Sequence, residues 1–217
     1  MLSGPELLPA GGESAVKKLV VFLHGYGSNG DDLIGLAPQL MPHLPGTAFV
    51  SPNAPTQVPN TYNGYQWFGI WDVTPWQIDQ GLRGVTPSVI DYITAQVKRF
   101  KITMADVALI GFSQGTMLSL HIGLRHLPGL AGVIGYAGAM VSPETFMSEK
   151  KTPLPPTLLV HGLMDNVVPW GATQMASDII RQNGGTVETL FRPTLMHSID
   201  NEGIKAGVRS LQSWFKF

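Results

Sequence analysis

The sequence predicts a three-layer α/β fold, in which helices cover both faces of a mostly parallel central sheet. Short, continuous apolar runs alternate with helical segments, as expected of parallel strands that are buried on both faces. The 217 residues are 44% hydrophobic and 13% charged, which suits a single domain over residues 1–217 with a large core. No internal repeat, low-complexity tract or linker divides the sequence.

Apolar runs and their boundaries define the first elements. Lys18 to Leu23 (KLVVFL) is a predicted buried strand, and Thr47 to Ser51 (TAFVS) is the next one. Between them, the segment from Asp31 to Leu40 begins with acidic residues and is followed by Pro42, which predicts a short helix.

A long aromatic segment follows, from Pro52 to about Gly84. It exceeds an ordinary connection between elements, which indicates a functional loop and leaves open whether residues 52–84 act as a mobile lid. Thr86 and Pro87 have the residue types of an N-cap and a first helical position, so a helix is predicted to begin there. Its inward-facing stripe consists of Ile90, Ile93, Val97 and Phe100.

The second half of the sequence repeats the strand–helix unit, which implies a parallel sheet in three layers. The predicted strands span residues 107–111, 131–136, 157–161 and 187–191. The predicted helices span residues 114–125, 172–182 and 204–215. Residues 142–156 form a polar, proline-rich connection.

The composition excludes several classes of protein. A formal net charge of −1 gives no basis for nucleic-acid binding, and no apolar run is long enough to cross a bilayer, so we expect no stable membrane association. The absence of cysteine excludes disulfides and a thiol nucleophile. The N-terminus lacks the basic and apolar regions of a secretory signal, so we expect a cytoplasmic protein. We expect neither a metal nor an organic cofactor, and the sequence leaves monomer and homodimer open.

The sequence Gly111-Phe112-Ser113-Gln114-Gly115 lies between a predicted strand and a predicted helix. In this context a G-x-S-x-G turn places its serine on a tight, exposed elbow at the edge of a sheet. Glycines accommodate the sharp turn, and the helix N-terminus favours negative charge at the site. Ser113 is therefore the predicted nucleophile, and the alternative is a glycine-rich turn without a catalytic role.

Asp165 and His197 are the predicted partners of Ser113, in the chain order Ser, Asp, His. Each follows a predicted strand, so both belong to loops at the carboxyl edge of the sheet. His197 would accept the serine proton and return it to the leaving group. Asp165 would orient the imidazole and stabilise its charged form.

Other histidines and acids compete for these roles. His161 is better explained as ordering the loop that carries Asp165, and His126 as a cation at a helix C-terminus. The remaining alternatives are His24, His43 and His121 for the base, and Asp72, Asp79, Asp178 and Asp200 for the acid.

Two backbone N–H groups are candidates for an oxyanion hole. The N–H of Gln114, the residue after the nucleophile, points into such a site. The second candidate is Tyr26, in the loop HGYGSN, because glycines on both sides let the backbone approach a substrate. The same loop is also explained as a strand-to-helix turn that is capped by Asn29 or Asp31.

The motifs LHGYGSN, SPNAP, WF, GFSQG, HGLMDNVVP and MHS, in this order, resemble the phospholipase/carboxylesterase family, which contains the acyl-protein thioesterases. The resemblance covers almost the whole chain. It implies an α/β-hydrolase fold of minimal size without a separate cap domain. It implies the triad Ser113, Asp165 and His197, with oxyanion donors at Tyr26 and Gln114. Many members have HGLGD in the first motif and GFSQGG at the elbow, whereas here Tyr26 and Ser28 occupy the first motif and Thr116 ends the second.

Apolar side chains near the triad indicate the kind of substrate. The predicted substrate-binding residues are Trp67, Phe68, Trp71, Met164 and Met196. The alternative for the aromatic residues is that they pin a long loop onto the sheet. No charged cluster marks a site for a phosphate or a carboxylate, so a neutral small-molecule acyl ester or thioester fits best.

The sequence therefore predicts a serine carboxylesterase that hydrolyses small- to medium-chain acyl esters through an acyl-enzyme intermediate. An acyl-protein thioesterase or a lysophospholipase with the same triad is an alternative. A non-catalytic ligand-binding protein on the hydrolase scaffold is a further alternative, against which the complete triad argues.

Overall fold

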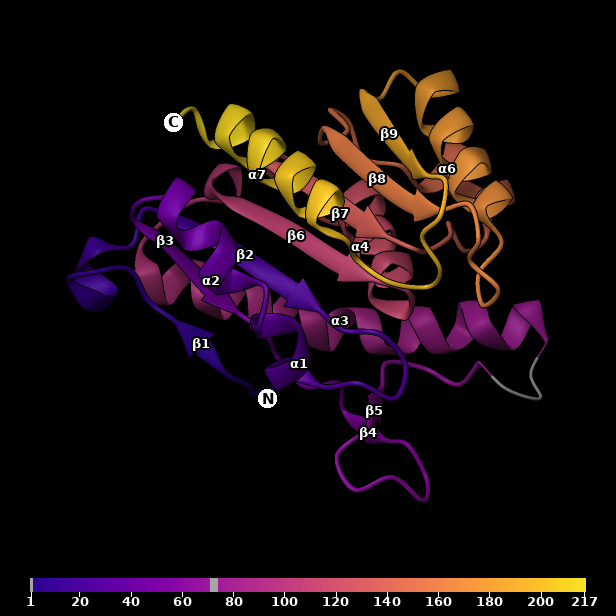
Figure 1. The fold of residues 1–217 in the computed structure, drawn as a ribbon, viewed down its shortest axis with the longest axis horizontal. Helices are drawn as coiled ribbons and strands as arrows, with labels where there is room; N and C mark the ends of the chain where they lie inside the picture. The colour runs from indigo at the N-terminus through magenta and orange to yellow at the C-terminus, as the bar shows by residue number, and fades with distance from the viewer. Residues whose placement is uncertain (1, 71–73) are drawn as a thin grey trace.

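The computed structural model describes residues 2–70 and 74–217, and its central feature is a seven-stranded sheet (Figure 1). The strand order is β1-β3-β2-β6-β7-β8-β9. Neighbouring strands are parallel except β1 and β3, which are antiparallel, so the predicted mostly parallel sheet is confirmed. The strands are β1 (Glu6–Leu7), β2 (Lys18–Leu23), β3 (Thr47–Val50), β6 (Val107–Phe112), β7 (Gly132–Tyr136), β8 (Thr157–Gly162) and β9 (Val187–Arg192).

Helices cover both faces of this sheet, as the repeated strand–helix units predict (Figure 1). One core lies between the sheet and α3, α4 and α6, and the other lies between the sheet and α1, α2 and α7. In β2, Leu19, Val21 and Leu23 enter the first core, whereas Val20 and Phe22 enter the second, because successive side chains of a strand point to opposite faces.

The helices have the following bounds. The α-helices are α1 (Gly30–Ile34), α2 (Ala37–Leu40), α3 (Pro75–Phe100), α4 (Gln114–Arg125), α5 (Phe146–Glu149), α6 (Trp170–Gln182) and α7 (Asn201–Phe215). The short 3-10 helices are η1 (Gly12–Ala15), η2 (Met41–His43), η3 (Met104–Asp106) and η4 (Pro143–Thr145).

The longest helix, α3, begins earlier than the sequence predicts, and the predicted start at Thr86 is wrong. Thr74 is the N-cap, Pro75 is the first helical residue, and the side chains of Thr74 and Gln77 form a reciprocal capping box. Thr86 and Pro87 repeat the residue types of Thr74 and Pro75, but no Glu or Gln follows three residues after Thr86 to complete a capping box. They lie inside the helix, where the Thr86 hydroxyl donates to a carbonyl one turn back at 2.7 Å.

The aromatic segment before α3 is therefore shorter than predicted, and it contains a small hairpin. Strands β4 (Thr56–Gln57) and β5 (Tyr65–Gln66) pair antiparallel within it. The predicted stripe of α3 is confirmed. Ile93 and Phe100 are buried, and the half-buried Ile90 and Val97 pack against the same core.

Other differences from the sequence-based prediction are small. The helix expected over residues 31–40 is divided into α1 and α2, because Pro38 fits the first turn of α2 but not the interior of a longer helix. Strand β1 and helix α5 have too few residues to produce a periodic pattern. Among the described residues, no helix has the length and apolar character that crossing a bilayer requires.

Candidate active site

Ser113 lies on the tight turn between β6 and α4. Its backbone φ is 53°, in the left-handed region that residues other than glycine rarely adopt. Its N–H donates to the carbonyl of Tyr136 at the end of β7 (2.9 Å), which fixes the turn against the neighbouring strand. The strand–turn–helix context expected of a nucleophile elbow is thus present at this serine.

Both glycines of the elbow are required by close backbone contacts. A Cβ atom on Gly115 would lie 1.8 Å from the carbonyl oxygen of Leu23, at the end of β2. A Cβ atom on Gly111 would lie 2.3 Å from the carbonyl oxygen of Gly115. The N-terminus of α4 can approach β2 only without side chains at these positions. This approach brings Ser113 beside the loop that follows β2.

Asp165 and His197 form a hydrogen-bonded pair from two different loops. His197 Nδ1 lies 2.7 Å from Asp165 Oδ2, and the Asp165 side chain has no exposure to solvent. The other carboxylate oxygen, Oδ1, accepts the backbone N–H groups of Val167 (2.8 Å) and Val168 (2.9 Å). Burial disfavours the charged carboxylate, but the hydrogen bonds from His197, Val168 and Val167 outweigh it and hold the pKa of Asp165 below its ordinary value. Asp165 is therefore an ionised acceptor for His197.

The loop between β9 and α7 holds His197 beside the elbow. An ion pair between Arg192 Nε and Asp200 Oδ2 (2.8 Å) joins the two ends of this loop. The His197 ring lies against the ring of Phe112, with centroids 4.9 Å apart, and Phe112 directly precedes Ser113. Between Ser113 Oγ and His197, both of which the structure describes, there is no hydrogen bond. His197 therefore lies next to the elbow, against Phe112, without a hydrogen bond to Ser113.

Gln114 anchors the aromatic loop with its side chain. Its Oε1 accepts the N–H of Trp67 (2.8 Å), and its Nε2 donates to the carbonyl of Phe68 (2.7 Å). Its backbone N–H occupies the first position of α4, where the helix itself offers no acceptor. The side chain of Gln114 is thus engaged in structure, which leaves the backbone N–H for the predicted oxyanion hole.

Tyr26 lies half-buried between two glycines of the loop after β2. Gly27 has a φ of 77°, and its N–H donates to the carbonyl of Tyr65 (2.8 Å). A Cβ atom on Gly25 would lie 3.0 Å from the ring of Phe112, so this loop packs directly against the elbow. Such proximity is what a contribution from the Tyr26 N–H requires, and the assignment of Tyr26 and Gln114 as oxyanion donors stays a prediction.

The aromatic residues named from the sequence differ in their exposure. Trp67 and Phe68 are only 3% and 4% exposed, in the core that α3 and α4 cover, and the Trp67 indole N–H donates to the carbonyl of His24 (2.9 Å). These contacts favour the alternative in which both rings pin the loop onto the sheet. Trp71 lies outside the described residues. Trp76, in the first turn of α3, is 69% exposed.

Met164 and Met196 lie on the two loops that carry Asp165 and His197. The N–H of Met164 donates to the carbonyl of Leu195 (3.0 Å), which joins these loops. The two methionine side chains are 59% and 55% exposed. Both are therefore accessible to a substrate, as their predicted binding role requires.

Four of the competing histidines have ring contacts that explain their presence without a catalytic role. His121 Nε2 lies 3.1 Å from His126 Nε2, and burial together with the nearby Arg125 lowers the pKa of His121 to about 3. His24 Nε2 accepts a backbone N–H at 3.0 Å. His161 Nε2 lies 2.9 Å from a carbonyl of the loop after β8, which confirms its predicted role in ordering that loop.

The competing acids that the structure describes are bound elsewhere: Asp79 to Arg83 and Ser142, Asp178 to Gln174, and Asp200 to Arg192. Asp72 lies outside the described residues. Over residues 2–70 and 74–217, no group of three or more histidine and acidic side chains is arranged to hold a metal ion.

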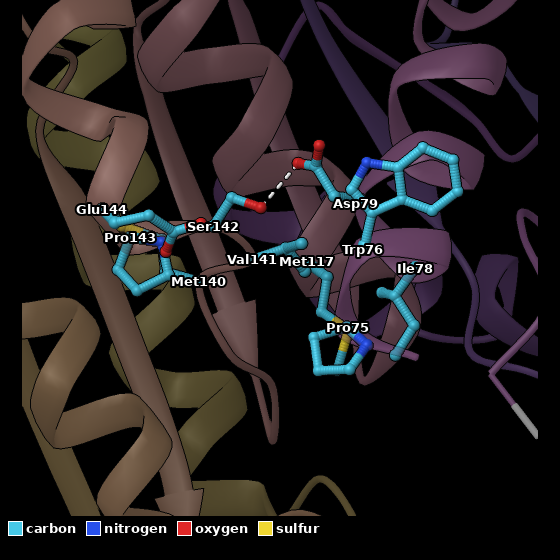
Figure 2. Close-up of a pocket in the computed structure, with 10 residues that line it drawn as sticks. All are labelled: Pro75, Trp76, Ile78, Asp79, Met117, Met140, Val141, Ser142, Pro143 and Glu144. Carbon is cyan, nitrogen blue, oxygen red and sulfur yellow. Dashed lines mark hydrogen bonds between the residues drawn. The ribbon is translucent and has the colours of Figure 1, made fainter. Parts of the chain in front are cut away.

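A pocket of about 430 Å³ opens between the start of α3 and the segment that follows β7 (Figure 2). Met117 lies in this pocket, and its N–H donates to the carbonyl of Ser113 (3.2 Å), so the pocket adjoins the elbow. Figure 2 shows the hydrogen bond from Ser142 Oγ to Asp79 Oδ1 (2.6 Å), which links the two sides of the pocket. The lining is mostly apolar and comprises Pro75, Trp76, Ile78, Asp79, Met117, Met140, Val141, Ser142, Pro143 and Glu144.

Comparisons with known proteins identify the family and the fold of the chain. Residues 10–215 match the model of the family described as phospholipase/carboxylesterase. The esterase YpfH of Escherichia coli (strain K12) is 26% identical over 202 residues, which cover 92% of this chain and 84% of YpfH. Acyl-protein thioesterase 1 homolog 1 of Dictyostelium discoideum is 27% identical over 198 residues, which cover 85% of each chain. The crystal structure of esterase PE8 is 33% identical, with a TM-score of 0.90 and coverage of 98% of both chains. The chain therefore belongs to the phospholipase/carboxylesterase family and has the α/β-hydrolase fold.

Proposed function

We propose that this protein is a serine carboxylesterase that hydrolyses small- to medium-chain acyl esters through an acyl-enzyme intermediate. One observation carries the proposal: a buried, ionised Asp165 binds His197 beside the elbow of Ser113. Membership of the phospholipase/carboxylesterase family and the likeness to esterase PE8 support it.

The hydrogen bond to Asp165 defines which nitrogen of His197 acts. Because Nδ1–H donates to the carboxylate, Nε2 keeps its lone pair and can take the hydroxyl proton of Ser113. Ser113 Oγ then attacks the ester carbonyl, and His197 returns the proton to the departing alcohol as the carbon–oxygen bond breaks. Water, deprotonated by the same histidine, hydrolyses the acyl-enzyme and restores the free serine.

The tetrahedral intermediates carry a negative oxygen that needs donors. The N–H groups of Gln114 and Tyr26 supply them in this proposal, together with the N-terminal end of α4. Removal of one such donor typically lowers kcat by roughly a hundred- to a thousandfold.

The pocket beside the elbow suits an acyl chain of limited length. Its volume of about 430 Å³ is near the lower end of the range for ligand sites, roughly 300–1,000 Å³. Met117 and Met140 give it adaptable apolar surface, and Trp76 adds an exposed ring at its edge. These features support esters with small to medium acyl groups over long-chain lipids.

A series of p-nitrophenyl esters, from acetate to palmitate, tests the proposal. We expect the highest kcat/KM at a short or medium chain and no turnover in Ser113→Ala. A wild-type protein that hydrolyses none of these esters would reject the esterase assignment. A maximum at palmitate would reject the proposed chain length.

An acyl-protein thioesterase with the same triad is the second candidate. The similarity to the acyl-protein thioesterase of Dictyostelium discoideum favours it. Peptides that carry the same acyl group on a cysteine sulfur or on a serine oxygen distinguish the two functions. A higher kcat/KM for the oxygen ester supports the carboxylesterase, and a higher value for the thioester supports the second candidate.

A further inference from the structure

Two pockets follow one another along the pair of helices α3 and α4. The pocket beside the elbow is lined by Asp79 from α3 and Met117 from α4. A second pocket, of about 340 Å³, is lined by Arg83 from α3 and His121 from α4. Each residue of the second pair comes four positions after its counterpart in the first, so the second pocket lies one helical turn beyond the first on both helices.

Three polar side chains occupy the boundary between these pockets. Asp79 Oδ2 accepts a hydrogen bond from Arg83 Nε (2.7 Å), and Asp79 Oδ1 accepts one from Ser142 Oγ (2.6 Å). Figure 2 shows Asp79 and Ser142 pointing toward each other from the two sides of the first pocket. Asp79 and Ser142 line the first pocket, and Arg83 lines the second. These three residues, here termed the polar partition, therefore separate the two pockets.

Other contacts hold both ends of the polar partition. Arg83 Nη2 donates to Glu149 Oε1 (2.9 Å). Arg125, which is buried, donates through Nη2 to the carbonyl groups of Val141 (3.1 Å) and Ser142 (2.7 Å). The Nε of Arg125 lies 3.0 Å from Glu149 Oε2, so the two arginines share one carboxylate. Helix α3 and the segment after β7 are thus tied to the same group, which keeps Asp79 opposite Ser142.

Asp79 is an ionised group at the end of a mostly apolar pocket. Its side chain is only 14% exposed. Burial disfavours the charged carboxylate, but the hydrogen bonds from Arg83 and Ser142 have the larger combined effect and lower the pKa of Asp79. A hydrocarbon chain that covered this ion pair would remove water from it and offer no hydrogen bond in return. An alkyl chain in the first pocket is therefore expected to stop at the polar partition.

The helix α4 gives the distance from the nucleophile to this boundary. Ser113, Met117 and His121 are spaced four residues apart, so they follow one another along one face of the helix. At about 1.5 Å per residue, Met117 lies roughly 6 Å and His121 roughly 12 Å along the axis from Ser113. An acyl group on Ser113 that follows this face would pass Met117 and meet the polar partition before it reached His121. This length suits a medium acyl chain and is too short for an extended palmitoyl chain.

We propose that the polar partition is the specificity determinant that limits the length of the acyl chain. The acyl group runs from Ser113 past Met117, fills the first pocket and ends at Asp79 and Ser142. This inference rests on the proposed function and names the groups that exclude longer chains from the site. A pocket that was limited by its apolar walls alone would not depend on the charges of Asp79 and Arg83.

Replacing the ion pair by apolar side chains tests the proposal. In the double variant Asp79→Leu, Arg83→Met, Glu149 keeps its ion pair with Arg125 and its hydrogen bond from Thr145 Oγ1 (2.9 Å), so no buried charge loses its last partner. We expect the maximum of kcat/KM along the p-nitrophenyl ester series to move to a longer acyl chain than in the wild type. For chains beyond the wild-type maximum, each further methylene that the joined pockets bury should raise kcat/KM about threefold to fourfold.

The double variant Asp178→Leu, Arg181→Met is the matched control. It removes an acid–arginine pair of α6, whose atoms are 3.9 Å apart and whose residues line neither pocket. The control should keep the maximum at the wild-type chain length. Because the readout is the position of the maximum and not the rate, a general loss of activity in either double variant does not imitate the effect.

The outcomes separate this inference from the proposed function. An unchanged maximum in the folded Asp79→Leu, Arg83→Met variant, or an equal shift in the control, would overturn the role of the polar partition while leaving the esterase assignment intact. A wild-type protein that hydrolyses no ester of the series would reject the proposed function and this inference with it.

A measurement on the wild type needs no variant to fold. A fluorophosphonate that carries a dodecyl chain is reacted with the protein, and the crystal structure of the adduct is determined. We expect the chain to run from Ser113 past Met117 and to stay on the near side of an intact Asp79–Ser142 hydrogen bond. A chain that lies outside the first pocket, or one that passes between Asp79 and Ser142 into the second pocket, would overturn the proposal.

Discussion

Replacing Asp165 by asparagine tests how the groups around this side chain define the tautomer of His197. The carboxylate has three hydrogen-bond donors: two backbone N–H groups on Oδ1, and the His197 ring on Oδ2. The backbone N–H groups cannot reverse, so the amide oxygen of asparagine must stay on them and its NH2 must face the histidines. His197 can accept from this NH2 only with its own hydrogen on Nε2. That tautomer cannot take the proton of Ser113.

The expected loss of kcat is about ten-thousandfold, the usual effect of this change in a serine triad. It corresponds to ~5 kcal/mol of transition-state stabilisation, at ~1.4 kcal/mol for each factor of ten. The new NH2 also lies beside Nε2 of His161, which is 3.0 Å from Asp165 Oδ2 in the wild type and is engaged with the Val168 carbonyl, so it offers this NH2 no acceptor. An unsatisfied buried donor costs about 1–3 kcal/mol, which is below the usual stability of a domain, about 5–15 kcal/mol. Asp165→Asn should therefore stay folded while it loses turnover.

The assay is steady-state hydrolysis of a short-chain p-nitrophenyl ester, with melting curves recorded on the same samples. Asp106→Asn is the matched control. Asp106 directly precedes β6 and Ser113 directly follows it, so the two residues lie at opposite ends of the same strand. The control should keep the wild-type kcat. A kcat for folded Asp165→Asn within tenfold of the wild type would refute the assignment of Asp165 as the orienting acid.

Three further predictions concern packing, acid stability and the pocket. Gly115→Ala should lower the free energy of unfolding by at least ~2 kcal/mol, because its Cβ would lie 1.8 Å from the last carbonyl of β2, and an unchanged urea midpoint would contradict this packing. Although burial favours neutral Asp106, its hydrogen bond from Lys18 holds its pKa below the ordinary value, so stability should fall as pH drops below about 4, where the unfolded chain takes up the proton first. Urea melts at neutral and acidic pH should show a shallower decline in Asp106→Asn, and an identical decline would exclude this source of acid sensitivity. Trp76→Ala should raise the KM for a medium-chain ester roughly several-fold and leave the KM for the acetate ester constant. Tyr62→Ala removes an exposed aromatic ring that does not line the pocket, so it should change neither KM value. Equal effects of the two variants would place the acyl chain elsewhere.

The sheet and the elbow could be predicted because their signals are local. Parallel strands that are buried on both faces are continuous apolar runs, and their predicted bounds agree with the structure to within one residue at each end. The elbow defines where α4 begins, so its predicted bounds, Gln114 and Arg125, are those of the structure. The pairing of Asp165 with His197 follows from the rule that sites lie beyond the carboxyl ends of parallel strands.

The start of α3 was missed because two Thr-Pro pairs compete for it. Thr74-Pro75 and Thr86-Pro87 both have the residue types of an N-cap and a first helical position. Only the first pair is followed by a glutamine that completes a capping box, and this difference decides which of them begins the helix.

The contact of His161 with Asp165 and the burial of Trp67 and Phe68 depend on tertiary structure. His161 and Asp165 are joined by the turn after β8, whose course no local pattern determines. Aromatic residues in an irregular loop have no periodicity that distinguishes a buried ring from an exposed one. Sequence patterns therefore indicated which residues form the site more reliably than how the groups around them are connected.

The most direct test of the proposed triad is the position of a fluorophosphonate adduct. Trypsin should release residues 102–125, a peptide that contains Ser113 and the buried Ser119, so fragmentation by mass spectrometry can distinguish the two hydroxyl groups. We expect the adduct on Ser113, its loss in Ser113→Ala, its retention in Ser119→Ala and strongly slowed labelling in His197→Ala. An adduct that persists in Ser113→Ala, or labelling at an unchanged rate in His197→Ala, would contradict the assignment of Ser113 as a nucleophile that His197 activates.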